Sequence, residues 1–415
     1  MSEIRPLVAD EFGAFVDILV NAYPSWITPT AEEKDRLRGR LLRMHEEDPQ
    51  RTAYGLFREG KLLGGMFLYD FVMNFRGVRV NAGGVGQVAV DLVHRKEHVA
   101  KELITYFIRH YRARGAPITM LYPFRPDFYW QMGFGYGTKM SQYRLRPAAL
   151  PRGPSKAHVR ALGEADVPAL LEFYNRTMAR THGLIERREQ DIRMQMSNVQ
   201  HRFVGYQRDA QIQGYLLFTF EKGESFFIND IHVREFFYED PEALAELLTF
   251  LHDQADQVRH IIFDTPDESF HFLPLDPRNG SYDMLPSIYH ESNTQGLGLM
   301  YRVVDVPALF RLLRGHNFGG QTCQLKLIVT DSFLPENAGS MLLHFVDGRL
   351  YVPDYGSHDV ELQIGIAGFS SLLAGAVNLR SLYRYGLVDV SDPARVDTLD
   401  AIFAVPEKPV CVTAF

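Results

Sequence analysis

The feature that most constrains the fold is an internal repeat. Residues 159–162 follow the pattern of residues 4–7 at an offset of 155, and residues 205–214 follow residues 55–64 at an offset of 150. Two nearly equal offsets indicate a duplicated domain. The Pro- and Gly-rich segment at residues 147–154 is typical of a linker between the copies. Because a chain of 415 residues exceeds one ordinary core, we expect two or three domains.

The first copy contains the stretch with the most chemical information, residues 87–137. It begins with an apolar strand at residues 87–90, and a polar, partly basic turn follows. Apolar residues at three-to-four spacing then predict a helix that starts near Val99. A second apolar strand at residues 118–122 leads to a Tyr-x-x-x-Gly-Phe sequence that begins at Tyr129. A basic turn that opens a helix is a natural site for a phosphate group, because free N–H groups and the helix dipole meet there.

The second copy lacks these features. Its strand at residues 228–233 is followed by the acidic turn Tyr238-Glu239-Asp240-Pro241-Glu242. Three carboxylates in that place would repel a pyrophosphate. No Tyr-x-x-x-Gly-Phe follows its next strand at residues 261–264. We therefore predict that the second copy is structural, and the third segment, from about residue 299, shows no catalytic constellation either.

Composition narrows the class of protein. A content of 46% hydrophobic and 23% charged residues is that of a soluble globular protein, and the net charge of −7 argues against nucleic acid as a partner. No apolar run of about 20 residues and no signal peptide are seen, which predicts a cytoplasmic protein without a membrane partner. The two cysteines are expected to be buried thiols. His94 and His98 lie four residues apart without a third ligand nearby, so no metal is expected.

With these residues in view, the chain resembles the Eis (enhanced intracellular survival) family of GCN5-related N-acetyltransferases (GNAT) over essentially its full length. The most specific match is residues 121–136, with support from residues 300–306 and the terminal aromatic Phe415. The resemblance implies an α/β (α+β) fold with tandem GNAT domains followed by a sterol-carrier-protein-like domain. The implied boundaries are 1–146 for the catalytic domain, 155–296 for the degenerate copy and 297–415 for the C-terminal domain.

The same resemblance implies a site for acetyl-CoA. The backbone around Val88 and Val90 would pair with pantetheine, and an N–H near Val88 would polarise the acetyl carbonyl. From the side chains alone, an ordinary buried strand explains these valines as well. Arg95 and Lys96 would bind the pyrophosphate at the start of the helix.

One position departs from the family's signature for this turn. The pattern Arg-x-x-Gly-x-Ala is matched by Arg95 and Ala100, but His98 occupies the glycine. A side chain there hinders close approach of a phosphate to the backbone, and Glu97 adds a negative charge. A protonated His98 could instead donate a hydrogen bond to the phosphate.

Two residues are implied in catalysis. Tyr129 would be the general acid, since a phenol with a pKa of about 10 can protonate a thiolate with a pKa of about 8.5 at a cost of ~2 kcal/mol. The α-carboxylate of Phe415 would help take the proton from the acceptor amine through a water molecule, and it would attract the ammonium form of the substrate. Packing of an aromatic ring and a frayed terminus are the alternative interpretations.

The acceptor is expected to be a small cationic amine. Tyr23, Trp26 and Phe67 could line its pocket, with Asp70 or Glu32 selecting cations, although core aromatics and solvated charges explain these residues equally well. The sequence thus predicts acetyl transfer to polyamine-, aminoglycoside- or lysine-like acceptors by direct attack in a ternary complex. The resemblance also implies a homo-oligomer such as a hexamer. The rival functions are a non-catalytic GNAT-fold binding protein and a lipid-binding module built on the C-terminal domain.

Overall fold

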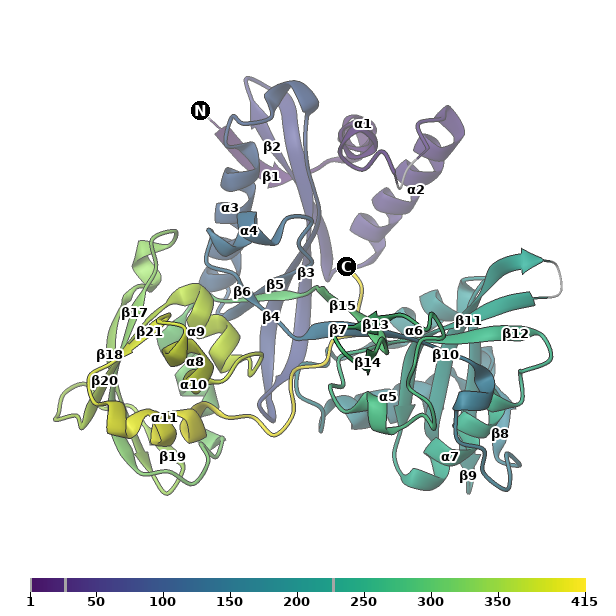
Figure 1. Ribbon diagram of the computed structural model, residues 1–415. Coiled ribbons are helices and arrows are strands. Elements are labelled where there is room, and N and C mark those ends of the chain that lie inside the picture. Colours follow the sequence, from purple (N-terminus) through teal and green to yellow (C-terminus); the bar gives the residue numbers. More distant parts are fainter. Residues whose placement is uncertain (1, 26–27, 226–227) are drawn as a thin grey trace. The chain divides into compact units, whose positions relative to one another are not determined.

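The computed structural model describes residues 2–25, 28–225 and 228–415. The chain forms two compact units (Figure 1). The first contains residues 1–137, 299–407 and 413–415, and the second contains residues 138–298 and 408–412. No helix in the described ranges is long and apolar enough to cross a membrane.

The first unit is built on a seven-stranded sheet with helices on both faces. Apolar residues alternate along its long strands, so that one face packs on α1 and α2 and the other on α3 (Figure 1). The strand order is β1 (Ser2–Pro6), β2 (Arg51–Arg58), β3 (Lys61–Phe75), β4 (Val78–Val90), β5 (Ile118–Leu121), β16 (Met300–Val303) and β6 (Gly135–Tyr136). The helices are α1 (Phe12–Ala22), α2 (Ala31–Glu47), α3 (Val99–Ala113) and the short α4 (Pro126–Trp130).

A second sheet in the same unit belongs to the C-terminal part of the chain. Its strand order is β19 (Arg349–Tyr351), β18 (Gly339–Val346), β17 (Cys323–Thr330), β20 (Val360–Gly365) and β21 (Val388–Val390). The accompanying helices are α8 (Val306–Leu312), α9 (Ile366–Leu373), α10 (Leu379–Arg384) and α11 (Val396–Phe403). Helix α9 packs on β17 and β20 and also on β16 and β6, so it joins the two sheets.

Buried arginines fix these two sheets to each other. Arg302 on β16 is fully buried, pairs with Asp331 at 2.6 Å and donates to the carbonyl of Met132. Arg76, at the tip of the β3–β4 hairpin, donates to the carbonyls of Leu373 and Phe403, where α9 and α11 end. Each guanidinium thus satisfies backbone carbonyls that burial would otherwise leave without a partner.

The second unit repeats the order of the first. Its sheet runs β15 (Asn293–Leu297), β7 (Lys139–Leu145), β12 (Val258–Thr265), β11 (Ile228–Tyr238), β10 (Gln211–Ser225), β9 (Arg202–Arg208) and β8 (Val159–Ala161). Helices α5 (Val167–Met178), α6 (Glu189–Ser197) and α7 (Pro241–His252) cover it. The succession β9, β10, β11, α7, β12 matches β2, β3, β4, α3, β5, as the sequence repeat predicts.

Two strands lie in sheets other than those that the linear boundaries imply. Strand β7 falls within residues 1–146, yet it pairs with β12 in the second unit. Strand β16 falls within residues 297–415, yet it lies between β5 and β6 in the first sheet. The chain therefore passes from the first sheet to the second at β7, which is a strand of the second sheet. It returns at β16, which is a strand of the first sheet.

Candidate active site

A cavity of about 680 Å³ opens in the first unit between the end of β4, the start of α3 and helix α4. All six residues predicted to bind acetyl-CoA line it, namely Val88, Val90, Arg95, Lys96, His98 and Ala100. So do Tyr129, which was predicted to be the general acid, and Tyr23, which was predicted to line the acceptor pocket.

Strand β4 separates from β5 where the cavity begins. The two strands pair in parallel only from Ala82 to Val85, whereas β4 continues to Val90. Gln87 has a φ of 52° and lies at a register shift between β3 and β4, which marks a β-bulge. The Tyr23 hydroxyl donates to the carbonyl of Val88 at 2.8 Å. The edge of β4 beyond Val85 thus faces the cavity, where an extended ligand can pair with its backbone.

The turn before α3 has a left-handed backbone conformation that glycine favours, although the turn contains no glycine. His98 caps the helix with a φ of 63°, in the left-handed region, and Lys96 has a φ of 68°. Such a conformation costs a residue with a Cβ about 1 kcal/mol. The first N–H groups of α3 have no partner within the helix and point toward this turn. His98 therefore replaces the glycine of the signature but keeps the positive φ that a glycine readily adopts.

The negative charge of Glu97 has partners of its own. Its carboxylate accepts from Arg58 and from His94, both at 3.2 Å. Arg95 and Lys96 remain exposed at the mouth of the cavity. The repulsion expected from Glu97 is thereby offset, and the turn as a whole is basic.

Tyr129 is packed among aromatic rings and also lines the cavity. It lies on α4, is only 3% exposed, and meets Phe128 and Phe134 edge-on at 5.2 and 6.0 Å. Burial raises the pKa of Tyr129 above its usual range, with a smaller contribution from Tyr23. Its hydroxyl therefore stays protonated at neutral pH, and transfer of its proton costs more than reference pKa values predict.

The last residue of the chain packs against β4. The ring of Phe415 contacts Tyr69, Phe71 and Tyr122 at centroid distances of 5.6, 5.0 and 5.2 Å. A Cβ built on Gly86 would lie 2.7 Å from the carboxyl carbon of Phe415. The terminus is held in place, which is the opposite of a frayed end, and its carboxylate lies one residue before the bulge.

The residues proposed for the acceptor are not brought together. Phe67 is fully buried in the core against Phe15 and Tyr69 and does not line the cavity. Tyr23 lines the same cavity as the acetyl-CoA residues, and Trp26 lies outside the described residues. The Asp70 carboxylate accepts from Tyr111 at 2.9 Å and from Arg114 at 2.8 Å, so its charge already has a partner.

Sequence reasoning missed several cavity residues. Lys101 follows Ala100 directly, and Arg125 and Gln131 lie four and two residues from Tyr129, so their nearness in sequence to predicted residues was the signal for them. Phe333 comes from the loop between β17 and β18 of the C-terminal part, and no motif indicated it. Only the fold brings this ring to the cavity.

The second copy differs at the corresponding turn. The Asp240 side chain caps α7 by accepting from the N–H of Ala243 at 2.8 Å, and Glu242 follows in the first turn. An acidic cap occupies the N–H groups that would otherwise bind a phosphate. This arrangement gives a physical reason for a structural role of the copy.

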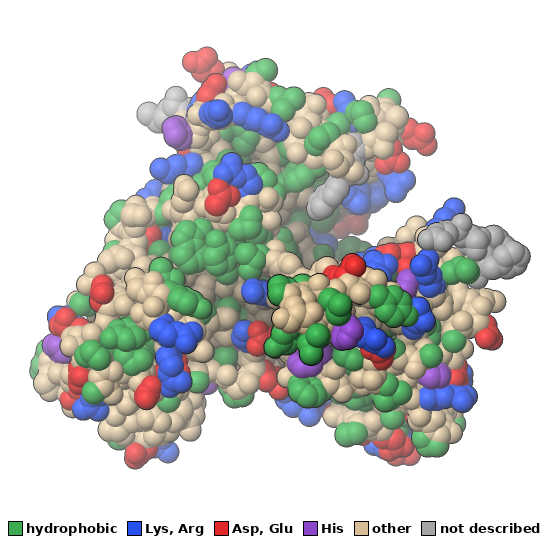
Figure 2. Space-filling model, viewed as in Figure 1, with side chains coloured by type: hydrophobic (Ala, Val, Ile, Leu, Met, Phe, Trp, Pro, Cys, Tyr) green, Lys and Arg blue, Asp and Glu red, His purple; other side chains and the backbone are tan. Residues whose placement is uncertain are grey.

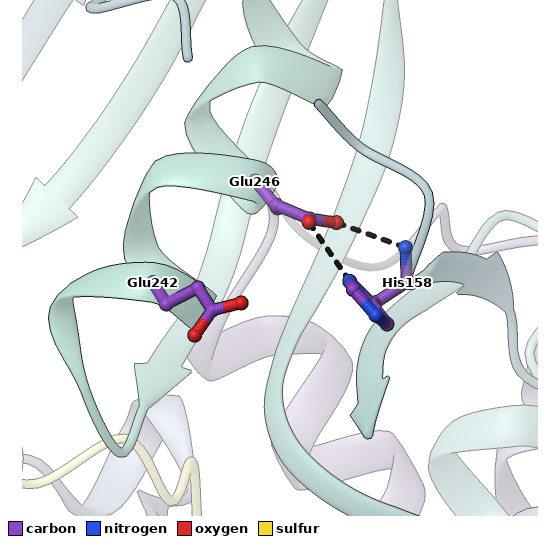
Figure 3. Close-up of side chains that lie close together, drawn as sticks. All are labelled: His158, Glu242 and Glu246. Carbon is purple, nitrogen blue, oxygen red and sulfur yellow. Dashed lines mark hydrogen bonds and ion pairs between the residues drawn. The ribbon is translucent and has the colours of Figure 1, made fainter. Parts of the chain in front are cut away.

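Two glutamates of α7 and His158, just before β8, form a cluster that could surround a metal ion. Ligand atoms of His158, Glu242 and Glu246 all lie within 4.8 Å of one another (Figure 3). Glu246 accepts from the backbone N–H and from Nδ1 of His158, both at 2.9 Å, and Glu242 pairs with Arg208 at 2.5 Å. Because both carboxylates have partners within the protein, the cluster is explained as an ion-pair network that fastens α7.

Comparison with known families agrees with this geometry. The family described as an acetyltransferase (GNAT) domain matches residues 3–137, and a second family of the same description matches residues 177–303. The chain is a GNAT acetyltransferase. A third family, described as a sterol carrier protein domain, matches residues 306–412. The predicted fold of two GNAT domains followed by a sterol-carrier-protein-like domain is thereby confirmed.

Solved structures share this arrangement over their full length. A GCN5-related N-acetyltransferase from Anabaena variabilis is 18% identical with a TM-score of 0.82, and one from Kribbella flavida is 21% identical with a TM-score of 0.78. Eis1 from Mycobacterium abscessus is 22% identical with a TM-score of 0.76. Each alignment covers 100% of both chains, so this GNAT acetyltransferase has an Eis-like fold throughout. No curated protein matches it at a significant level.

Proposed function

We propose that this enzyme transfers the acetyl group of acetyl-CoA to the primary amine of a small cationic acceptor. The observation that carries the proposal is the position of Phe415. Its carboxylate lies beside Gly86, next to the segment of β4 whose backbone faces the cavity. An anion placed there is suited to attract an ammonium group and to accept its proton, directly or through a water molecule.

The residues of the cavity fit acetyl-CoA. The thioester would lie beside the bulge, with pantetheine along the backbone of residues 86–90 and the pyrophosphate at the start of α3. Arg95 and Lys96 add two cations to the free N–H groups of the helix. Acetyl-CoA supplies an acyl group activated as a thioester, and the protein supplies binding, orientation and proton transfer.

Tyr129 has the role of proton donor at the sulfur. Its buried hydroxyl remains protonated, and it lies in the same cavity as Val88. No cysteine lines the described cavity, which favours direct attack in a ternary complex over an acyl-enzyme on a thiol. We place the enzyme in the cytoplasm, where acetyl-CoA is formed and consumed.

An exposed apolar hairpin supports the proposal of a homo-oligomer. Strands β13 (Met284–Leu285) and β14 (Tyr289–His290) form this arm, and apolar side chains gather on the face that carries them (Figure 2). Tyr282, Met284, Leu285, Ile288 and Tyr289 are each 57% to 81% exposed. At roughly 100 Å² each they present on the order of 500 Å², near the upper end for a monomer. Two arms together approach the ~1,000 Å² of a specific interface, and we infer a second copy as the partner.

The test of the proposed reaction is an amine panel with acetyl-CoA. Release of the CoA thiol is followed for polyamines, aminoglycosides and lysine peptides, with neutral alcohols of similar size as controls. Mass spectrometry of the product should show one added acetyl group on a primary amine. Binding of acetyl-CoA without thiol release for any amine would instead support a non-catalytic binding protein.

A further inference from the structure

An aromatic ring from the C-terminal domain forms part of the cavity wall. Phe333 lies between β17 and β18, far along the chain from residues 87–137, and lines the same cavity as α3 and α4. Its ring is partly buried and packs on the core beneath α3. The Lys101 ammonium lies 5.7 Å from the centre of this ring.

The loop that carries Phe333 is held without help from a ligand. The N–H groups of Phe333 and Leu334 donate to Asp331 Oδ1 at 3.2 and 2.9 Å. The other oxygen of Asp331 accepts from Arg302 at 2.6 Å, and both side chains of this pair are 0% exposed. The backbone at Phe333 is thus held by a fully buried ion pair, and the Arg302 guanidinium lies 5.7 Å from the centre of the ring. A loop ordered before the ligand arrives is the condition for a preorganised binding surface.

Lys101 lies on α3 about one turn beyond His98, and the ring of Phe333 is next to it. Tyr23 lines the cavity beside Val88, whose carbonyl accepts a hydrogen bond from the Tyr23 hydroxyl. Along the chain, the turn at Arg95–His98 comes between Val88 and Lys101. Acetyl-CoA is a linear molecule in which the thioester, pantetheine, pyrophosphate and 3′-phosphoadenosine follow one another. With its thioester at β4 and its pyrophosphate at the start of α3, the nucleoside reaches Lys101 and Phe333.

We propose that Phe333 is the surface on which the adenine of CoA stacks and that Lys101 binds its 3′-phosphate. This inference rests on the proposed use of acetyl-CoA, and it assigns the C-terminal domain a direct part in recognising the cosubstrate. A fixed aromatic ring favours a planar base. Among the described residues no carboxylate pairs with Lys101, whose ammonium contacts the Phe333 ring, so its charge can also bind a phosphate.

Truncated forms of the ligand test the two contacts separately. Calorimetry measures the Kd of CoA, of dephospho-CoA, which lacks the 3′-phosphate, and of pantetheine, which lacks the whole nucleotide. Phe333→Ala should weaken CoA about 5- to 100-fold and leave pantetheine unchanged. Lys101→Ala should weaken CoA about 5-fold or more and leave dephospho-CoA unchanged.

Control variants separate recognition from folding. Phe333→Tyr keeps an aromatic face and should bind CoA like the wild type, whereas Tyr355→Ala removes an exposed ring of the same domain that lies outside the cavity and should change nothing. The proposal is overturned if Phe333→Ala weakens CoA and pantetheine equally, or weakens neither.

The proposed function can fail independently. A wild-type protein that binds CoA but acetylates no amine refutes the reaction and leaves the nucleotide contacts to be judged from the same titrations. A wild-type protein that does not bind CoA refutes both.

Discussion

Gly86 and Phe415 approach each other so closely that a Cβ on the glycine would lie 2.7 Å from the carboxyl carbon of the last residue. Real Cβ atoms do not come this near, so one of the two segments would have to move. Strand β4 is held in its sheet along Ala82–Val85 and by β3. The terminal segment should therefore be the one that yields.

This contact predicts the effect of Gly86→Ala. Displacing the carboxylate should lower turnover by ~10²-fold or more, since that is the usual contribution of general acid–base catalysis. The Kd of acetyl-CoA should change little. Gly13→Ala is the matched control, because a Cβ at that position meets nothing within 4 Å. Full activity of Gly86→Ala would show that the carboxylate is not needed where the structure places it.

Changing the chain end itself should have the same consequence. Deleting Phe415, or adding a Gly-Ser tail after it, removes the carboxylate from its position and should cost ~10²- to 10⁴-fold in acetyl transfer. The deficit should shrink at high pH, where more of the acceptor amine is already deprotonated. An N-terminal tag should be harmless, and equal melting temperatures would exclude a loss of stability. A tailed enzyme with full activity at neutral pH would falsify the role of Phe415.

Tyr129→Phe should lower turnover by ~10²-fold or more with little change in acetyl-CoA affinity. Burial raises the pKa of Tyr129, so its hydroxyl should stay protonated beyond the ordinary value of about 10. Ionisation of Tyr129 should therefore not lower the kcat/KM of the wild type between about pH 8 and 10. Over this range the pH profiles of the wild type and of Tyr129→Phe should have the same shape. A fall of kcat/KM in this range that is seen in the wild type but not in Tyr129→Phe would contradict the role of Tyr129 as general acid. Unchanged turnover in the variant would contradict it as well.

His98→Gly should stabilise the protein and tighten acetyl-CoA binding. Glycine adopts the φ of 63° without strain, so the free energy of unfolding should rise by about 1 kcal/mol. The loss of the side chain also lets a phosphate approach the backbone. Lys96→Gly is the matched comparison, because it relieves similar strain but removes a cation, and it should stabilise the fold while weakening binding. Weaker binding by His98→Gly would mean that His98 itself contacts the phosphate.

Ile288→Glu combined with Tyr289→Glu should dissociate the proposed oligomer. Both side chains are exposed on the β13–β14 arm, so charges there should not affect the fold of one subunit but should oppose burial against a second copy. Light scattering after size exclusion measures the change in mass. Tyr355→Glu, at another exposed tyrosine, serves as the control. An unchanged mass for the double variant would place the interface elsewhere.

The sequence predicted what local patterns and the repeat can specify. Leu37, Leu41 and Met44 recur at the spacing of a helix, and α2 spans them. The sequence Glu59-Gly60-Lys61 is likewise typical of a hairpin turn, and Glu59 and Gly60 have the positive φ of a tight hairpin. The basic turn and Tyr129 were located because one continuous segment, residues 87–137, carries both.

Such local patterns do not predict which strands pair when they are far apart in sequence. Strand propensity does not say which sheet a strand joins, so β7 and β16 could not be placed. Glycines at positions 83, 84 and 86 interrupt the apolar pattern, so the sequence did not indicate that β4 is one continuous strand with a bulge at Gln87. Phe333 was missed for a related reason, because its proximity to α3 depends on the buried pair of Arg302 and Asp331. Phe67 is the opposite case, because it was predicted to line the acceptor pocket but is buried in the core.

The placement of β16 has a consequence for the order of events at the ribosome. Strand β5 ends at Leu121, but its neighbour β16 begins at Met300, after the entire second unit has been translated. Until then the nascent sheet has an open edge at β5, which is a place for mispairing. Pairing between segments so far apart in sequence is also slow. Strand β7 likewise emerges before its partner β12. All strands of the second sheet have been synthesised by Leu297, so this sheet can be completed before the first one, which still needs β16.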